Sequence, residues 1–156
     1  MVKYDILSPR GLRDVIYNVE GMPILRYNHY NNGELVFKGF SNFSVSDVKD
    51  WQRDINRGFK YVVGHTGEEL IVPDDIVGVL KFVSPRDKYN CLDIKYCDIR
   101  NGFEEEGIAR GLIKKIWEMY GENIGVRYGN NLIEQAYTYC DSSAQRELVD
   151  VDEEAW

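Results

Sequence analysis

The sequence predicts a single α/β (α+β) domain in which helices flank a central sheet. Three runs rich in β-branched and aromatic residues follow one another at 59–64, 76–83 and 92–99, which is the composition of strands. A loop with glycines then leads into 108–120, where apolar residues recur at helical spacing. The length of 156 residues and the hydrophobic content of 44% suit one compact domain with a sizeable core.

A short helix is expected to open the fold. Ser8 and Pro9 have the character of an N-cap and a first helical position, and Gly21 ends the segment. Between them, four apolar residues recur with the period of an amphipathic helix: Leu12, Val15, Ile16 and Val19. We therefore expect this helix to pack on the core with one face.

Residues 24–58 predict a hairpin and a second helix. The runs 24–30 and 34–40 flank the sequence Asn-Asn-Gly at 31–33, which is typical of a tight hairpin turn. Ser46 is then expected to cap a helix that Gly58 closes. Three apolar residues predict the buried face of that helix: Val48, Trp51 and Ile55.

After the three strands, the chain is expected to end in mixed structure. The short apolar run 70–72 is a candidate strand edge, and Gly121 is expected to stop the helix 108–120. Residues 124–128 predict a short strand, and 130–140 have apolar residues at helical spacing. Residues 146–151 are a further strand candidate. Nothing divides the chain into two domains, so we expect one domain over residues 1–156, with an acidic tail at 147–156.

Charge and composition exclude several classes of function. The net charge of −7 argues against a nucleic-acid-binding protein, because such proteins present a basic face to phosphates. No apolar run approaches the ~20 residues that span a bilayer, and the N-terminus lacks the apolar core of a signal peptide. We expect a cytoplasmic protein with no membrane partner.

The cysteines and histidines predict no metal site. Cys91, Cys97 and Cys140 form an odd set without Cys-x-x-Cys spacing, so we expect reduced thiols rather than a disulfide framework. His29 and His65 belong to no ligand motif, and a lone histidine is more often a surface or hydrogen-bonded structural residue.

The loop between Ile99 and the helix 108–120 has the outline of an anion site. The first N–H groups of a helix have no partner within the helix, and the helix dipole places partial positive charge at the same end. A glycine-bearing loop that leads into such a helix start therefore offers a binding place for a phosphate group.

This stretch resembles the signature of the GNAT superfamily of acyl-CoA N-acyltransferases: an apolar strand, a short loop, then Gln/Arg-x-x-Gly-x-Gly/Ala and apolar residues. Residues 104–109 (Glu-Glu-Glu-Gly-Ile-Ala) fill the motif, and Phe103 stands where the family often has an aromatic residue. Arg110, Leu112 and Ile113 fill the continuation of the motif. The resemblance covers about 59–139, whereas the N-terminal region 1–58 diverges from the usual strand and paired helices.

The resemblance implies a mixed, mostly antiparallel central sheet. It also implies transfer of an acetyl group from acetyl-CoA to a primary amine of a small molecule or peptide. The splayed end of the strand near Ile99 would bind the pantetheine arm and the thioester carbonyl through backbone groups. The other residues to which the resemblance assigns cofactor contacts are Glu104, Gly107, Ile108, Ala109, Arg110 and Asn131.

Three glutamates depart from the family pattern. Glu104 replaces the usual Gln or Arg, and Glu105 and Glu106 follow it. Carboxylates beside a pyrophosphate would repel it. Acidic residues in a first helical turn are also an ordinary charge pattern, favoured by the dipole at about 0.3–1 kcal/mol each.

Two residues are candidates for proton transfer. The resemblance places Tyr139, with Tyr137 as the alternative, where a phenol would protonate the leaving thiolate; core packing is the competing interpretation. Asp93 is the candidate general base, and the competing interpretation is a solvent-facing carboxylate paired with Lys95. In a regular strand Asp98 lies on the opposite face from Asp93, and a bulge would change that assignment. We expect direct transfer, without an acyl-cysteine intermediate.

Two other classes of function stay open at this point. One is a catalytically inactive binding or regulatory protein with the GNAT fold, which the glutamate run favours. The other is an unrelated α+β interaction protein whose aromatic content of 13% serves a protein interface. The sequence also leaves a monomer and a homodimer both open.

Overall fold

The computed structural model describes residues 1–17, 25, 27–31, 33–83, 91–121, 125–128 and 131–133. The elements follow in the order β1 (Lys3–Leu7), α1 (Pro9–Ile16), β2 (Tyr27–Asn31), β3 (Glu34–Phe37), α2 (Val45–Lys49), α3 (Trp51–Asn56), β4 (Phe59–His65), the 3₁₀ turn η1 (Pro73–Asp75), β5 (Ile76–Val83), β6 (Cys91–Ile99), α4 (Ile108–Tyr120), β7 (Gly125–Tyr128) and β8 (Asn131–Ile133).

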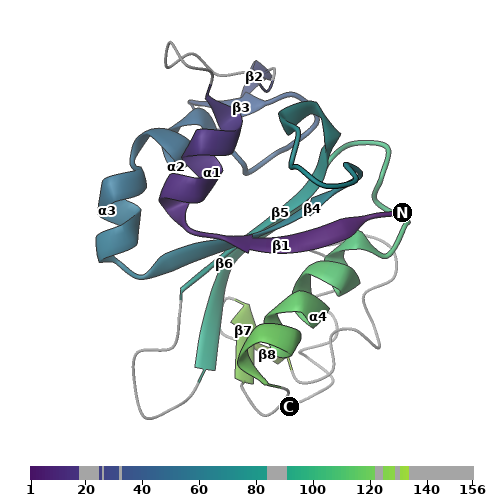
Figure 1. Ribbon diagram of the computed structural model, residues 1–156. Coiled ribbons are helices and arrows are strands. Elements are labelled where there is room, and N and C mark those ends of the chain that lie inside the picture. Colours follow the sequence, from purple (N-terminus) through teal and green to yellow (C-terminus); the bar gives the residue numbers. More distant parts are fainter. Residues whose placement is uncertain are drawn as a thin grey trace.

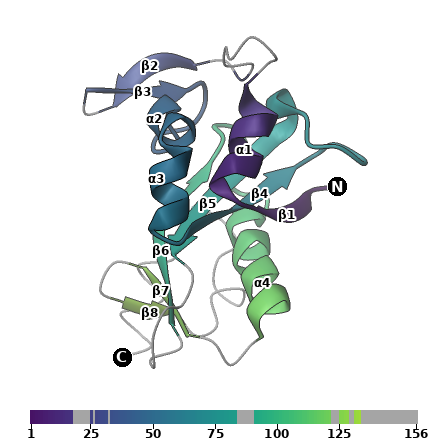
Figure 2. The ribbon, with the colours of Figure 1, turned by 60° about the vertical axis from the view of Figure 1, so that its left-hand side comes forward.

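A six-stranded sheet forms the centre of the fold, in the order β1-β4-β5-β6-β7-β8. Its neighbouring strands are antiparallel except β6 and β7, which are parallel. That parallel pair requires a crossover, and α4 lies within it. Helices α1 to α3 lie on one side of the sheet and α4 on the other, while β2 and β3 form a separate hairpin (Figures 1 and 2). The mixed class and mostly antiparallel sheet are thus as expected.

The expectation that a helix opens the fold is wrong, because strand β1 precedes α1. Tyr4 and Ile6 of this strand pack against the core under α4, whereas Lys3 and Asp5 alternate to the other face. The strand is only five residues long, so its alternation is a weak signal. The helix begins where we expected it: the Ser8 hydroxyl accepts a hydrogen bond from the Gly11 N–H at 3.0 Å. The predicted stop at Gly21 is wrong, because the helix ends at Ile16 and the backbone of Tyr17 is extended.

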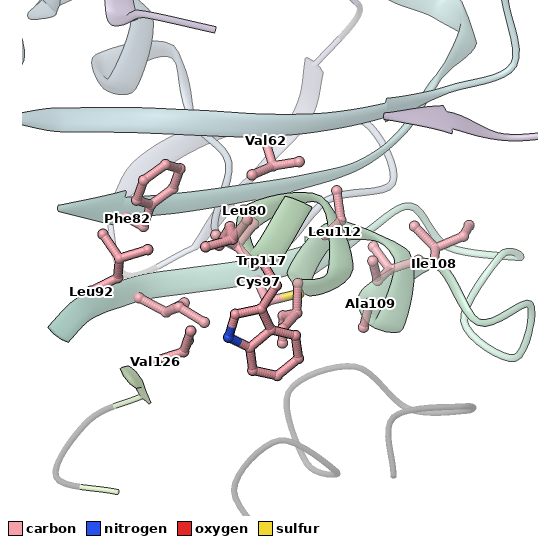
Figure 3. Packing of buried hydrophobic residues seen from close by; sticks show 14 of the residues in the cluster. Val62, Leu80, Phe82, Leu92, Cys97, Ile108, Ala109, Leu112, Trp117 and Val126 are labelled. Atoms are coloured by element: carbon pink, nitrogen blue, oxygen red, sulfur yellow. The ribbon is translucent and has the colours of Figure 1, made fainter. Parts of the chain in front are cut away.

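Two buried clusters pack on the two faces of the sheet. The cluster beneath α4 joins the apolar stripe of this helix to inward-facing residues of β4, β5 and β6 (Figure 3). Its fully buried members include Val62, Leu80, Phe82, Leu92, Leu112, Ile113 and Ile116. The second cluster lies beneath α1 and α2 and includes Leu12, Ile16, Phe37, Phe43, Val48, Tyr61 and Val63. The sheet is therefore covered on both faces, and α4 is held where its N-terminus meets the end of β6.

The second predicted helix is two helices, α2 and α3, that meet at Asp50. The backbone of Asp50 has φ −92° and ψ 27°, which leaves the helical region. After this break Ile55 is exposed and Asp54 is buried, so the predicted face fails beyond Val48. Gly58 ends α3 with φ +81°, as expected.

Two smaller predictions are also wrong. Residues 70–72 form no strand and precede the 3₁₀ turn. Residues 131–133, predicted as the start of a helix, form strand β8 paired with β7. The strands predicted at 59–64, 76–83, 92–99 and 124–128 agree with the structure to within one residue at each end. The predicted hairpin is also present, but its first strand starts at Tyr27 instead of residue 24, and its second strand ends at Phe37 instead of residue 40. Residues 134–156, with the predicted strand 146–151 and the acidic tail, lie outside the described residues.

Candidate functional site

The loop of residues 100–107, which we call the anion loop, ends in the left-handed residue that starts α4. Gly107 is the N-cap with φ +74° and ψ 19°, a conformation that side chains other than glycine rarely adopt. A Cβ at this position would meet nothing within 4 Å, so the space beside the helix start is open. The first intrahelical bond runs from the Gly111 N–H to the Gly107 carbonyl at 3.1 Å.

The N–H groups that precede this bond have no acceptor within the helix. The side chains of Ile108 and Ala109 are 1% and 4% exposed and anchor the helix start in the core. They can therefore meet a ligand only through their backbone N–H groups. Arg110 is exposed on the same first turn. The structure thus brings Gly107, Ile108, Ala109 and Arg110 together at one helix end.

The three glutamates lie before α4, so they are not the first-turn charge pattern that the sequence suggested. No acidic residue stands in the first turn of α4. Glu104 turns back on its own loop, where its Oε2 accepts a hydrogen bond from the Gly102 N–H at 2.8 Å. Glu105 and Glu106 are exposed. Only Glu104 is therefore fixed, and its bonded carboxylate oxygen is engaged with the loop backbone.

Strand β6 continues past the end of β7 before it reaches the anion loop. The two strands pair only over residues 91–94 of β6, whereas β5 pairs with β6 as far as Ile99. The Arg100 N–H donates to the Val77 carbonyl of β5 at 2.8 Å. Because alternate residues of an antiparallel ladder face the same neighbour, Ile99 directs its backbone groups away from β5. These groups point to the β7 side of β6, beyond the last residue of β6 that pairs with β7.

A bulge in β6 overturns the expected placement of Asp93 and Asp98 on opposite faces. Lys81 pairs with Tyr96 and Phe82 with Ile94, so Lys95 is an extra residue. The extra residue shifts the alternation by one and brings Asp93 and Asp98 to the same face. Asp93 is exposed. The ammonium of Lys95, its expected partner, lies over the Phe59 ring at 5.9 Å from the ring centroid.

For the remaining predicted residues, the structure gives only the position of Asn131 in the sheet. Asn131 starts β8, where it pairs with Tyr128. Tyr139 and its alternative Tyr137 lie outside the described residues. Cys97 is buried in the core beneath α4.

Sequence reasoning missed a buried ion cluster between the sheet and the helices α2 and α3. The Lys81 ammonium lies 2.9 Å from Asp47 Oδ1 and 3.1 Å from Asp54 Oδ2, and all three side chains are at most 12% exposed. The Tyr61 hydroxyl donates to Asp54 Oδ2 at 3.4 Å. Burial, reinforced by the charges of Asp47 and Asp54, raises the pKa of Tyr61 far above its usual value.

A cavity of about 510 Å³ between β1 and α4 was also missed. Its walls carry three lysines and three acidic residues, together with the buried His65, whose Nε2 shares a 2.8 Å hydrogen bond with Asp5 Oδ2. No residue of the anion loop lines this cavity. His65 is thus a buried, hydrogen-bonded residue.

No family model, curated protein or solved structure matches this chain. Within the described ranges, no helix has both the length and the apolar character needed to cross a membrane. Among the same residues, no group of three or more His, Cys, Asp or Glu side chains is placed to hold a metal ion.

Proposed function

We propose that this protein is a GNAT-like N-acetyltransferase that moves an acetyl group from acetyl-CoA to the primary amine of a small molecule or peptide. One observation carries the proposal. The outward backbone of Ile99 and the N-terminal turn of α4, whose first N–H groups have no acceptor within the helix, lie at the two ends of a single glycine-containing loop. In acetyl-CoA an extended thioester arm is joined to a pyrophosphate, and these two binding elements suit those two parts of the molecule.

The arrangement of strands supports the same proposal. An antiparallel run of β4, β5 and β6 leads into the anion loop, as the resemblance implies. A strand also opens the fold, although the hairpin β2–β3 separates α1 from α2 and α3. Beyond the four residues that pair with β7, strand β6 continues to Ile99, the stretch that the resemblance assigns to the pantetheine arm. Fold alone does not establish activity, so the binding elements are what the experiment must test.

In the proposed reaction the amine nitrogen attacks the thioester carbonyl carbon, and the C–S bond breaks as the amide forms. The backbone of Ile99 would orient the thioester, and the first turn of α4 would hold the pyrophosphate. Asp93 would take the amine proton through a relay of waters, because it lies six residues before Ile99 and so about 20 Å away along the strand. Tyr139 would give a proton to the leaving thiolate. Because Asp93 is exposed, bound substrates would have to shield it from water to make it an effective base.

Calorimetric titration of acetyl-CoA tests the binding site. Gly107→Glu adds a carboxylate to the open space at the helix start, so we expect it to abolish the saturable binding that the wild type shows. Gly121→Glu is the matched control, because Gly121 also has a positive φ and open space but lies at the opposite end of α4. Absence of binding by the folded wild type, or equal binding by both variants, would contradict the proposal.

The alternative is a catalytically inactive protein that kept the same fold and binds coenzyme A. The exposure of Asp93 favours it, since an exposed carboxylate is a weak base near neutral pH. Binding of acetyl-CoA without release of free thiol, across a panel of small amines and peptide N-termini, would select this alternative over the enzyme.

A further inference from the structure

A turn from a distant part of the chain supports the anion loop. We call residues 39–43, which follow β3, the support turn. The Asn101 N–H donates to the Gly39 carbonyl at 2.7 Å, and the Arg100 guanidinium lies 5.3 Å from the ring centroid of Phe40. The Arg100 Nη1 group also donates to the Asp74 carbonyl at 2.7 Å. The first two residues of the anion loop are therefore fixed by contacts outside the loop.

The support turn is itself fixed by the carboxylate of Asp98, one residue before the end of β6. Oδ1 accepts from the N–H and the hydroxyl of Ser41 at 3.2 and 3.1 Å. Oδ2 accepts from the N–H groups of Asn42 and Phe43 at 2.6 and 2.8 Å. Asp98 is only 4% exposed. Three successive N–H groups thus enclose one buried carboxylate, an arrangement that binds anions.

Gly39 makes the contact between turn and loop close. Its φ is +85°, and a Cβ there would lie 2.9 Å from Arg100 Cγ and 3.6 Å from the Asn101 nitrogen. A side chain at this position would therefore press directly on the first two residues of the anion loop. The support turn and the anion loop are packed as one unit.

We propose that Asp98 is a positioning residue for the anion loop: by fixing the support turn, its carboxylate fixes the backbone of residues 100–103. The identity of the bound anion rests on the proposed function, but the effect on loop order does not. A loop ordered before binding loses less entropy when a ligand arrives, so Asp98 would raise affinity without touching the ligand.

Amide hydrogen exchange measured by NMR tests this role directly. Asp98→Asn places an NH₂ group opposite the N–H donors of the support turn, so the bonds that fix this turn are weakened. We therefore expect the amides of Asn101 and Phe103 to exchange about tenfold faster relative to those of β5. Asp54→Asn is the matched control, because Asp54 is equally buried and hydrogen-bonded but contacts Lys81 and Tyr61 instead. The proposal would be overturned if Asp98→Asn sped up exchange in the loop no more than in β5. It would also be overturned if Asp98→Asn and Asp54→Asn sped up exchange in the loop equally.

A second pair of variants approaches the loop from the turn. Gly39→Ala should also speed exchange at Asn101, whereas Gly33→Ala, with a similar φ of +80° but nothing within 4 Å, should not. Equal exchange in this pair would also count against the proposal.

Titration of coenzyme A separates this role from the proposed function. If the wild type binds, Asp98→Asn should bind about tenfold more weakly than Asp54→Asn, since loop disorder must then be reversed on binding. If loop amides exchanged faster in Asp98→Asn than in Asp54→Asn but the wild type bound no coenzyme A, the positioning role would stand and the proposed acetyltransferase activity would be refuted.

Discussion

The two faces of the sheet are stabilised by different means. Beneath α4 the buried cluster is built of apolar side chains that follow the period of the helix and the strands. Beneath α1 to α3 the core also buries Lys81, Asp47, Asp54 and Asp98, each held by specific hydrogen bonds or ion pairs. The apolar face tolerates any well-shaped packing, whereas the polar face depends on each partner being present.

The polar face gives the largest expected effect. Lys81→Met would leave Asp47 and Asp54 without their shared cation, and removing one partner of a buried ion pair costs about 3–5 kcal/mol. We expect urea unfolding to show a loss of this size. Adding Asp47→Asn and Asp54→Asn to this variant should recover most of the loss. A loss below about 1 kcal/mol would show that the cluster is hydrated and that the two faces are alike.

The apolar face should respond through cavity formation instead. Leu112 is fully buried beneath α4, so Leu112→Ala should lower the free energy of unfolding by about 3 kcal/mol. Lys114→Ala on the exposed side of the same helix is the control and should change it by less than about 0.5 kcal/mol. No accompanying substitution of a charged residue should recover the loss in Leu112→Ala, in contrast to Lys81→Met.

The same difference explains what could be predicted from the sequence. Helix α4 and strands β4 to β6 follow from local apolar periodicity, and the anion loop follows from the glycines before α4. The partners of Asp98 lie 55 to 57 residues away, and those of Lys81 lie 27 and 34 residues away. No local pattern links such positions. The buried polar contacts of this face were therefore not predicted, whereas its apolar residues Leu12, Ile16 and Val48 were.

The bulge at Lys95 shows the same limit within the candidate site. Neither a glycine nor a proline lies at this bulge to indicate it in the sequence, yet the bulge brings Asp93 and Asp98 to the same face. Asp93 is exposed there, whereas Asp98 is buried and bonded to the support turn. The helix 108–120, by contrast, has the predicted bounds, and it begins directly after Gly107, whose left-handed conformation favours glycine.

A smaller effect tests how closely α4 approaches the sheet. A Cβ at Gly111 would lie 2.1 Å from Tyr4 Cζ and 2.2 Å from its hydroxyl. Gly→Ala within a helix otherwise stabilises by about 1 kcal/mol. We therefore expect Gly111→Ala to stabilise by about that amount only in a Tyr4→Leu background, as measured by a double-mutant cycle. Equal effects in both backgrounds would mean that the Tyr4 ring turns aside freely.

The smallest effect should be found at alkaline pH and on the polar face. Burial, followed by the charge of Asp47, raises the pKa values of both Tyr61 and Tyr96 well above the usual value. In the unfolded chain these phenols ionise near pH 10, so folding then binds protons and stability falls as the pH rises. The full contribution of these phenols to stability is present below pH 10. At pH 10, ionisation of each phenol in the unfolded chain should lower the free energy of unfolding by about 0.4 kcal/mol.

Thermal unfolding at pH 8 to 10.5 would measure this loss. Tyr96→Phe should remove about half of it, because one of the two buried phenols no longer titrates. Tyr4→Phe, on the α4 face and only half-buried, should remove less, although burial also raises the pKa of Tyr4. If Tyr4→Phe reduced the dependence of thermal stability on pH as much as Tyr96→Phe, the alkaline sensitivity would not belong to the polar face. The contrast between the two cores would then be confined to the ion cluster of Lys81.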